Sequence, residues 1–257
     1  MNIQHTNTLG FRLATIAIIF VIFLAISNVL YAEVLWSTSH ETGDLSDWCS
    51  EDQNWECVFN TGGSDASVTV TSEAAHTGDY AVKMEVWNID TQLRACRIFR
   101  WAEYLTEGYY SCWFMFPTLP TVNDWLDIFQ FKKTDGVTTD PTWYNEVKDK
   151  SFGTVLTLTH WGEEWDIPPN VKPSPALAAG KWFHVEWYYK DGTADGELQI
   201  WINGQKVWDM RNVDTRGVDP DIQWAPSLYG QNVSPSHLVL YMDDAVISEE
   251  RVGPNSF

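Results

Sequence analysis

The stretch Lys181–Lys190 and its neighbour Glu197–Asn203 carry side chains suited to sugar binding. Both stretches alternate as strands do, so that one face of the first is apolar and the other polar. The polar face is expected to hold His184, Glu186, Tyr188, Gln199, Trp201 and Asn203. Rings can stack on pyranose faces while amides reach hydroxyls. The alternative is an ordinary solvated sheet face, which antiparallel sheets often have.

Glycoside hydrolysis would need a different set of residues, namely two facing carboxyl groups about 5–5.5 Å apart for retention and wider for inversion. Asp127 and Glu186 are the pair that could meet across a sheet. However, Asp127 alternates with Trp125, Phe129 and Phe131, an unusual face for a solvated acid. No Glu-x-Asp-x-Glu pattern, phosphate-binding glycine loop, Gly-x-Ser-x-Gly elbow or His-Glu-x-x-His motif occurs. The sequence therefore gives little support to glycoside hydrolysis.

The chain is acidic, with 35 Asp and Glu against 16 Lys and Arg and a net charge of −19. Such a field repels nucleic acid and acidic membrane surfaces. The 15 tryptophans favour sugar faces that are neutral or partly apolar, and a highly sulfated polymer is disfavoured. We expect a monomer whose partner is a polysaccharide.

The first 32 residues have the order of a secretory signal: Arg12, an apolar run densest over Ala14–Ile26, and a small residue, Ala32, before the expected cleavage point. An uncleaved anchor over Phe11–Tyr31 is the alternative. Either way, the protein is expected to be secreted or otherwise outside the cytoplasm. Residues 33–257 then suit a single large β-domain.

All four cysteines follow that signal, which fits an oxidising compartment where disulfides persist. Three pairings are possible. We favour Cys49 with Cys57, which closes a short loop, and Cys96 with Cys112, which would link neighbouring strands. Metal binding by the thiols is less favoured because no C-x-x-C pair is present.

Short alternating stretches separated by turn residues predict an all-β fold, a two-sheet antiparallel sandwich. No stretch after the signal shows a helical stripe. Asn203-Gly204 predicts a two-residue hairpin turn. Thr134–Ser151 and Trp161–Ala179 resist assignment as strands and are expected to form a rim over a binding groove. The expected strands are Asp79–Trp87, Gly108–Phe116, Trp125–Lys132, Thr154–His160, Lys181–Lys190, Glu197–Asn203 and His237–Ser248.

The order of several weak motifs resembles that of the heparin-lyase-like polysaccharide lyases and, more loosely, of other concanavalin-A-like glucanases and laminin-G-type modules. The motifs cover most of residues 76–248. They are His76–Val86, Arg94–Arg100, Tyr109–Pro117, Trp125–Gln130, Gly180–Val185, Trp201–Gly204 and the closing Asp243-Asp244 strand. The resemblance implies a concanavalin-A-like jelly roll that cleaves a uronate-containing glycan by β-elimination. A non-catalytic carbohydrate-binding or laminin-G-like module is the alternative.

The same resemblance implies roles for individual residues. An arginine and a glutamine would neutralise the uronate carboxylate, and a tyrosine or histidine would remove the C5 proton. Arg97 and Gln130 match the first pair, with Arg94 as the substitute for Arg97 if the strand register differs. Lys132 stands where related lyases would have histidine, which His160 could replace. Tyr188 and Tyr229 are the proton-transfer candidates.

Related jelly rolls also imply a structural calcium ion that joins the first and last strands. Its ligands here would be Glu41, a carbonyl near Gly43 or Gly78, and Asp243, because calcium takes carboxylate and carbonyl oxygens. A pair of solvated turn acids is the alternative. The enzyme hypothesis requires Arg97, Gln130 and Tyr188 to converge on one sugar-sized space.

Overall fold

The computed structural model describes residues 33–49, 57–61, 63–101, 107–134, 139–160, 162–165, 173–215 and 221–255. The unit from Glu33 onward is built almost entirely of β-strands in two antiparallel sheets. The predicted all-β sandwich is confirmed. The predicted signal, residues 1–32, lies outside the described residues. Among those described, no helix is long and apolar enough to cross a bilayer.

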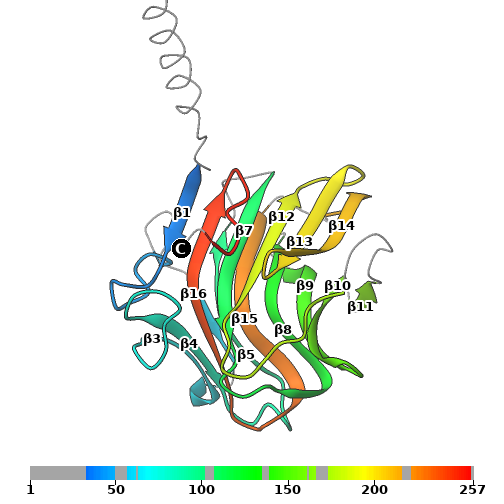
Figure 1. Cartoon of the computed structure of the whole chain (residues 1–257). Helices are drawn as coiled ribbons and strands as arrows, with labels where there is room; N and C mark the ends of the chain where they lie inside the picture. The colour runs from blue at the N-terminus through cyan, green and yellow to red at the C-terminus, as the bar shows by residue number, and fades with distance from the viewer. Residues whose placement is uncertain are drawn as a thin grey trace, which may run out of the picture. The chain divides into compact units, whose positions relative to one another are not determined.

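Each sheet has eight strands (Figure 1). Sheet A runs in the order β14 (Gln205–Val213), β13 (Gly196–Ile202), β12 (Phe183–Lys190), β7 (Glu107–Met115), β16 (Leu238–Ser248), β4 (Ala81–Val86) and β3 (Ala66–Thr71), with β1 (Val34–Thr38) also on β16. Sheet B runs in the order β11 (Glu163–Trp165), β10 (Gly153–His160), β9 (Thr139–Lys150), β8 (Thr121–Thr134), β15 (Asp221–Ser234), β5 (Arg94–Ile98) and β2 (Val58–Asn60), with β6 (Arg100–Trp101) also on β15. A short 3-10 helix spans Gly63–Asp65.

The core lies between the two sheets, and period-two alternation supplies it from both. In β12 the apolar residues Phe183, Val185, Trp187 and Tyr189 all enter the core. Their rings meet the aromatic side chains of β8: Phe129 lies 5.2 Å from Trp187 and Phe131 lies 4.4 Å from Tyr189, centroid to centroid. Because burial of such large rings supplies much of the hydrophobic stabilisation, this contact fixes how β12 and β8 face each other.

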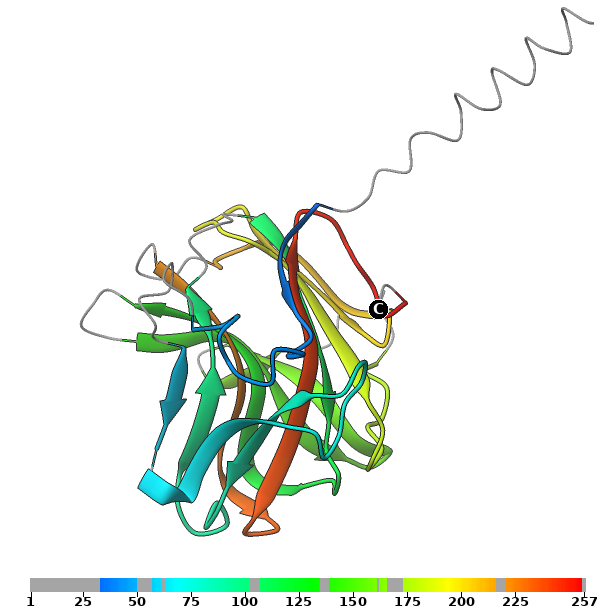
Figure 2. The same cartoon turned by 90° about the vertical axis from the view of Figure 1, so that its left-hand side faces the viewer.

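The two ends of the chain meet at one strand of sheet A. β1 pairs with β16, as the blue and red strands show in Figure 2, with Ser37 opposite Val246 and Thr38 opposite Ala245. The predicted hairpin turn is confirmed as well. Asn203 and Gly204 have φ of 50° and 77° and join β13 to β14. Both values lie in the left-handed region that asparagine and glycine tolerate.

Two parts of the fold differ from the expectation. Most of Thr134–Ser151 belongs to β9, in the middle of sheet B, and is not a rim loop. β15 was not expected at all, although it forms 14 residues of strand beside β8. Both segments carry polar side chains on one face and a proline, and these features resemble those of loops.

One of the two predicted disulfides is present and the other is not. Cys49 and Cys57 are bonded, with their Cα atoms 5.0 Å apart. The predicted bond between Cys96 and Cys112 is wrong: both are buried free thiols. Cys96 lies on β5 of sheet B and Cys112 on β7 of sheet A, so the two cysteines occupy facing layers and not neighbouring strands. Stacked sheets lie about 10 Å apart, beyond the Cα separation that a disulfide spans.

One polar link crosses the apolar core. The indole N–H of Trp187 in sheet A donates to Asn145 Oδ1 in sheet B over 2.8 Å, and Asn145 Nδ2 donates to the Thr157 carbonyl over 3.0 Å. Both Asn145 and Trp187 are fully buried. A hydrogen bond of this kind fixes the lateral position of one sheet on the other, because a slip would leave polar groups unpaired inside the core.

We expect Asn145→Leu to lower the free energy of unfolding by about 1–3 kcal/mol, since the Trp187 N–H and the Thr157 carbonyl lose their partner. Chemical denaturation measures this. Trp187→Phe and the double variant complete the cycle, and additive effects of the two changes would contradict a direct link.

Alkylation of the denatured protein without reductant is expected to label Cys96 and Cys112 and to leave Cys49 and Cys57 unlabelled. Peptide mass spectrometry with and without prior reduction measures this. If Cys96 and Cys112 are alkylated only after reduction, the two cysteines form a disulfide and the structural argument against that bond is wrong.

Candidate active site

The outer face of sheet B, turned away from sheet A, gathers most of the polar side chains of interest. A β-bulge in β8 creates this arrangement: Asp127 pairs with Glu146 and Phe129 with Asn145, so Ile128 is an extra residue. Ile128 and Phe129 therefore both enter the core, and Asp127 and Gln130 both point outward. Strict alternation had assigned Asp127 to the face of Phe129, and that assignment is wrong.

Arg97 and Gln130 lie close together on this face. Arg97 on β5 pairs with Ser227 on β15, and Gln130 Nε2 donates to Ser227 Oγ over 2.8 Å. The Arg97 guanidinium lies 4.3 Å from the centroid of the Phe59 ring. Arg97 Nε and Nη1 and Gln130 Oε1 are buried and have no partner within the described part of the chain. Burial lowers the pKa of Arg97, while Tyr229 and Asp127 oppose that effect.

Asp127 and Glu146 form a buried acidic pair beside them. Asp127 is 2% exposed and its Oδ1 has no partner among the described residues. Glu146 accepts from Thr159 over 2.8 Å and forms an ion pair with Lys148 over 3.0 Å. Burial, and then the charge of Glu146, raise the pKa of Asp127 well above its ordinary value, against opposing effects of Lys148, Lys132 and Arg97.

Two tyrosines and a tryptophan line a cavity of about 350 Å³ around Asp127. Tyr144 on β9 accepts an N–H from Gly162 over 2.9 Å at its hydroxyl. Tyr229 on β15 packs edge-on against Trp125, with centroids 4.5 Å apart. Burial raises the pKa of both tyrosines and the charge of Asp127 adds to it, whereas only Tyr229 has an arginine, Arg97, that lowers its pKa in return.

The remaining candidates on sheet B are divided between its faces. Lys132 shares the outer face with Gln130 by period two and is buried. His160 lies on the core face, where its ring stacks on Trp143 at 4.1 Å, so it cannot replace a histidine beside Gln130. Arg94 also points away from Arg97. Its guanidinium binds Asp65 at 2.7 Å and the Trp87 carbonyl at 3.0 Å, which makes it a structural residue.

The face of sheet A that was expected to bind sugar is covered by the end of the chain. Glu186 is fully buried and accepts from Arg251 Nε, Val252 N and Gly253 N, each over 2.9 Å. Arg251 also lies 4.6 Å from the centroid of Trp201. Gln199 and Asn203 are similarly engaged, with Lys206 Nζ and the His184 N–H respectively. Burial lowers the pKa of His184 to about 3. Asn203 and Arg251 line a hollow of about 380 Å³ together with the end of the chain, whereas His184 and Glu186 are fully buried.

Tyr188 belongs to that face of sheet A, where its hydroxyl donates to Glu107. It does not converge with Arg97 and Gln130, which lie on the outer face of the other sheet. The pairing of Asp127 with Glu186 is wrong for the same reason: two stacked sheets separate the two carboxyl groups.

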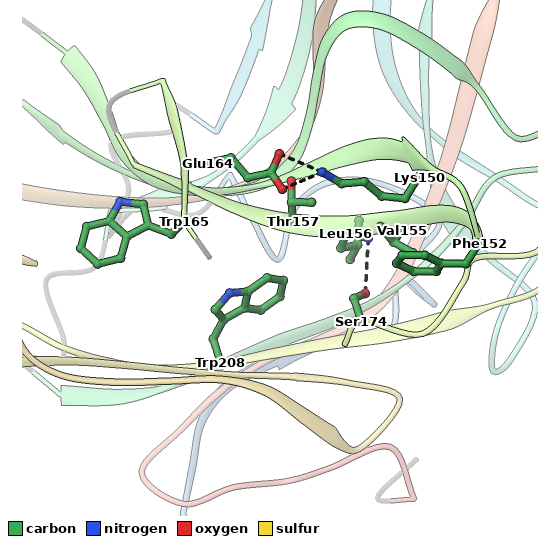
Figure 3. Close-up of a pocket in the computed structure, with 9 residues that line it drawn as sticks. All are labelled: Lys150, Phe152, Val155, Leu156, Thr157, Glu164, Trp165, Ser174 and Trp208. Carbon is green, nitrogen blue, oxygen red and sulfur yellow. Dashed lines mark hydrogen bonds and ion pairs between the residues drawn. The ribbon is translucent and has the colours of Figure 1, made fainter. Parts of the chain in front are cut away.

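A second hollow of about 440 Å³ opens between the edge strands of the two sheets (Figure 3). Trp165 of β11 and Trp208 of β14 lie on its two sides, with the Lys150–Glu164 ion pair above them. Most of the remaining lining is apolar, and Ser174 already contacts the Leu156 N–H. This hollow offers no cluster of unpaired charged groups, so we place the candidate active site on sheet B.

The residues expected to bind calcium are satisfied by N–H groups. Glu41 accepts from the backbone N–H groups of Asp79 and Tyr80, each at 3.0 Å to its Oε1. Asp243 accepts from the N–H groups of His76 and Asp244, each over 2.8 Å, and its Oδ1 contacts His40 Nδ1 at 3.2 Å. Each of these N–H groups occupies a lone pair of a carboxylate oxygen that a cation could otherwise use. The described residues contain no group of three or more metal-binding side chains. Calcium stays a prediction that these contacts do not support.

Gly43 and Gly78, the expected carbonyl donors, serve the turns here. Both have positive φ, and a Cβ on Gly78 would lie 2.3 Å from Glu41 Oε1. Gly78 therefore allows the Glu41 carboxylate to approach the backbone of residues 79 and 80.

Comparison with known proteins shows the fold. No family model and no curated protein matches the sequence. Among solved structures, the chain is similar to an endo-β-1,4-glucuronan lyase from the fungus Trichoderma reesei, with a TM-score of 0.63, 17% identity and coverage of 84% of this chain and 96% of that one. It is also similar to the cellulose-induced protein Cip1, with a TM-score of 0.56, 17% identity and coverage of 85% and 99%. A variant of alginate lyase Aly36B, in complex with an alginate trisaccharide, has a TM-score of 0.51, 16% identity and coverage of 87% and 96%. The chain thus has the jelly-roll sandwich found among carbohydrate-active proteins.

Sequence reasoning missed several residues of the site. Tyr144 and Glu146 lie in the segment taken as a rim loop. Asp127 was considered for hydrolysis alone and ranked low because it alternates with Trp125, Phe129 and Phe131, an alternation that the bulge breaks. Alternation of Tyr144, Glu146 and Lys148 against Trp143, Asn145 and Val147 is the signal that could have revealed β9.

We expect chelation of divalent cations to leave Tm unchanged and Glu41→Ala to lower it by removing the acceptor of two N–H groups, at a cost of about 1–2 kcal/mol. Thermal melts with and without EDTA measure both effects, and Glu249→Ala, at the exposed residue that follows β16, serves as the control. A fall of Tm on chelation would establish the cation.

Proposed function

We propose that this protein is a polysaccharide lyase that cleaves a uronate-containing glycan by β-elimination on the outer face of sheet B. One observation carries the proposal. Arg97, Gln130 and Asp127 on this face each keep a buried polar atom without a partner in the described chain, and Asp127 lines a cavity together with two tyrosines. Unpaired buried groups cost about 1–3 kcal/mol each, so a ligand that satisfies them would bind strongly. The similarity of the fold to uronate lyases supports the same class.

The chemistry follows from the environments of the two tyrosines. The C5 proton of a uronate becomes acidic only when donors stabilise the negative charge that develops on its carboxylate, and Arg97 is the fixed cation nearest Tyr229. Ionised Tyr229 would take the C5 proton. The released electron pair forms the C4–C5 double bond while the C4–O4 bond breaks, and Tyr144 gives a proton to O4. Proton exchange with solvent then resets both phenols.

The assignment of base and acid rests on neighbouring charges. Burial raises the pKa of both tyrosines, but only Tyr229 has an arginine, Arg97, that lowers its pKa in return, whereas Glu146 raises the pKa of Tyr144 further. Two titratable groups whose environments differ in this way suit opposite roles. Trp125, half-buried beside Tyr229, offers a ring on which a sugar can stack.

The remaining parts of the proposal concern where the protein acts. The signal-like N-terminal sequence and the Cys49–Cys57 disulfide support action outside the cytoplasm, on a polysaccharide partner. Binding of the glycan without cleavage, by a non-catalytic module, is the outcome expected if the tyrosines take no part.

Glycoside hydrolysis is a second candidate, favoured by one observation: Asp127 and Glu146 oppose each other across β8 and β9 at the same cavity. It ranks lower because Lys148 and Thr159 already engage Glu146. Elimination leaves unsaturated uronate ends that absorb in the ultraviolet, whereas hydrolysis leaves new reducing ends without that absorbance.

We expect Tyr229→Phe and Tyr144→Phe each to lower kcat on glucuronan or alginate by about 10²- to 10⁴-fold, because each removes one proton transfer. Ultraviolet absorbance of the products measures the rate. Tyr80→Phe, on the exposed loop before β4, is the matched control. Loss of activity in Tyr188→Phe with full activity in the other two variants would move the site to sheet A.

A further inference from the structure

Asp127 is the most unusual group of the candidate site. Its side chain is almost fully buried, its Oδ1 has no partner in the described chain, and it lines the cavity between Tyr144 and Tyr229. The catalytic scheme proposed above does not use it. A carboxyl group kept in such a place costs stability.

The charges around Asp127 decide its protonation state. Glu146, directly opposite on β9, forms an ion pair with Lys148 and accepts a hydrogen bond from Thr159. Two carboxylates on facing positions cannot both ionise easily, so the proton resides on the one with the weaker support, which is Asp127. The charged or titratable groups that face Asp127 are Asp124 and Lys132 on β8, Tyr144, Glu146 and Lys148 on β9, Glu164 on β11, Arg97 on β5 and Tyr229 on β15.

One N–H of the Gln130 amide is given to Ser227, and the atom left without a partner in the described chain is the carbonyl oxygen, Oε1, an acceptor. A sugar hydroxyl can satisfy that oxygen, but a carboxylate cannot. Besides Arg97 and the second N–H of Gln130, a further buried donor on this face that could meet a carboxylate is the O–H of a protonated Asp127.

We propose that Asp127 acts as a neutral carboxylic acid that donates a hydrogen bond to the carboxylate of the bound uronate, opposite the guanidinium of Arg97. This inference rests on the proposed function, because it assigns the uronate to the same cavity. It makes Asp127 a catalytic residue that touches the substrate and leaves Gln130 to bind a sugar hydroxyl. No proton is transferred: the Asp127 O–H bond stays intact and the uronate oxygen accepts.

The consequence is a pH dependence with a defined direction. When the pH rises through the pKa of Asp127, which burial and Glu146 raise, the O–H donor is lost and a carboxylate faces the carboxylate of the substrate. Affinity for a uronate oligosaccharide is then expected to fall with rising pH, while an asparagine at the same position keeps an N–H donor at every pH.

The first experiment measures binding of a glucuronan tetrasaccharide and an alginate tetrasaccharide by calorimetry between pH 5 and 9 (about the range where such proteins stay folded). We expect Asp127→Asn to bind within about threefold of the unmodified protein and without its loss at high pH. Asp127→Ala is expected to bind about 10- to 150-fold more weakly, the value of a hydrogen bond to a charged group. If Asp127→Asn binds as weakly as Asp127→Ala, Asp127 acts in its ionised form and the proposal is overturned.

The second experiment needs no substrate. An acid whose pKa is raised on folding makes the folded state bind the extra proton, so stability falls as the pH rises from the unfolded value near 4 toward the raised value. Asp127→Asn is therefore expected to raise Tm more at pH 8 than at pH 4. An equal change at both pH values would overturn the neutral acid even if lyase activity is found. Uronate binding without elimination would overturn only the proposed function.

Discussion

A single extra residue in β8 determines which side chains reach the outer face of sheet B. Ile128 has no partner of its own in the pairing of β8 with β9, and the strand after it is turned over relative to the strand before it. Asp127 and Gln130, three residues apart, share a face as a result. β15 accommodates the same irregularity on the other side of β8, where Asp127 pairs with Tyr229 and Phe129 with Pro226. The acid, the amide and the phenol therefore stand together because of one local feature of the backbone.

The core holds this feature in place. Phe129 and Phe131, the two aromatic residues of β8 after the bulge, pack on Trp187 and Tyr189 of the facing sheet. The hydrogen bond between Asn145 and Trp187 lies beside them and fixes β9 to the same strand of sheet A. A shift of β8 by one residue would move these rings to the surface and carry Gln130 and Lys132 into the core. The positions of the polar residues are thus as strongly specified as the hydrophobic packing beneath them.

The two outer faces of the sandwich differ in whether their buried polar groups have hydrogen-bond partners. On sheet A, the end of the chain satisfies Glu186 with three N–H donors, and Arg251 covers Trp201. On sheet B, buried atoms of Arg97, Asp127 and Gln130 stay without partners in the described chain. On sheet A, the Glu186 carboxylate thus has its hydrogen-bond donors within the chain itself. The outer face of sheet B keeps groups whose burial costs free energy, and natural proteins retain such groups mainly at functional sites.

Sequence alone predicted what period-two alternation and turn chemistry determine. The faces of β12 and β13, the Asn203-Gly204 turn and the shared face of Gln130 and Lys132 follow from these rules. It could not predict the bulge, because Asp127-Ile128-Phe129 has no glycine or proline to mark one. β9 and β15 were hidden by polar residues and by Pro141 and Pro226. The sequence also could not show which segment covers the outer face of sheet A, since Glu186 binds a segment some 65 residues further along the chain.

The local charge of the site differs from that of the whole protein in a way that bears on its ligand. A net charge of −19 repels an anionic polymer at long range, but salt screens that repulsion beyond about 8–10 Å. Several of the charges near Asp127 are buried, so they interact at lower dielectric and with little screening. The cations there are Arg97, Lys132 and Lys148, the other acids are Asp124, Glu146 and Glu164, and a proton on Asp127 removes one further negative charge. A single uronate carboxylate would therefore meet local charges that are close to balance on a protein that is acidic overall, whereas a polymer with several sulfates per residue would extend its charges beyond the cavity.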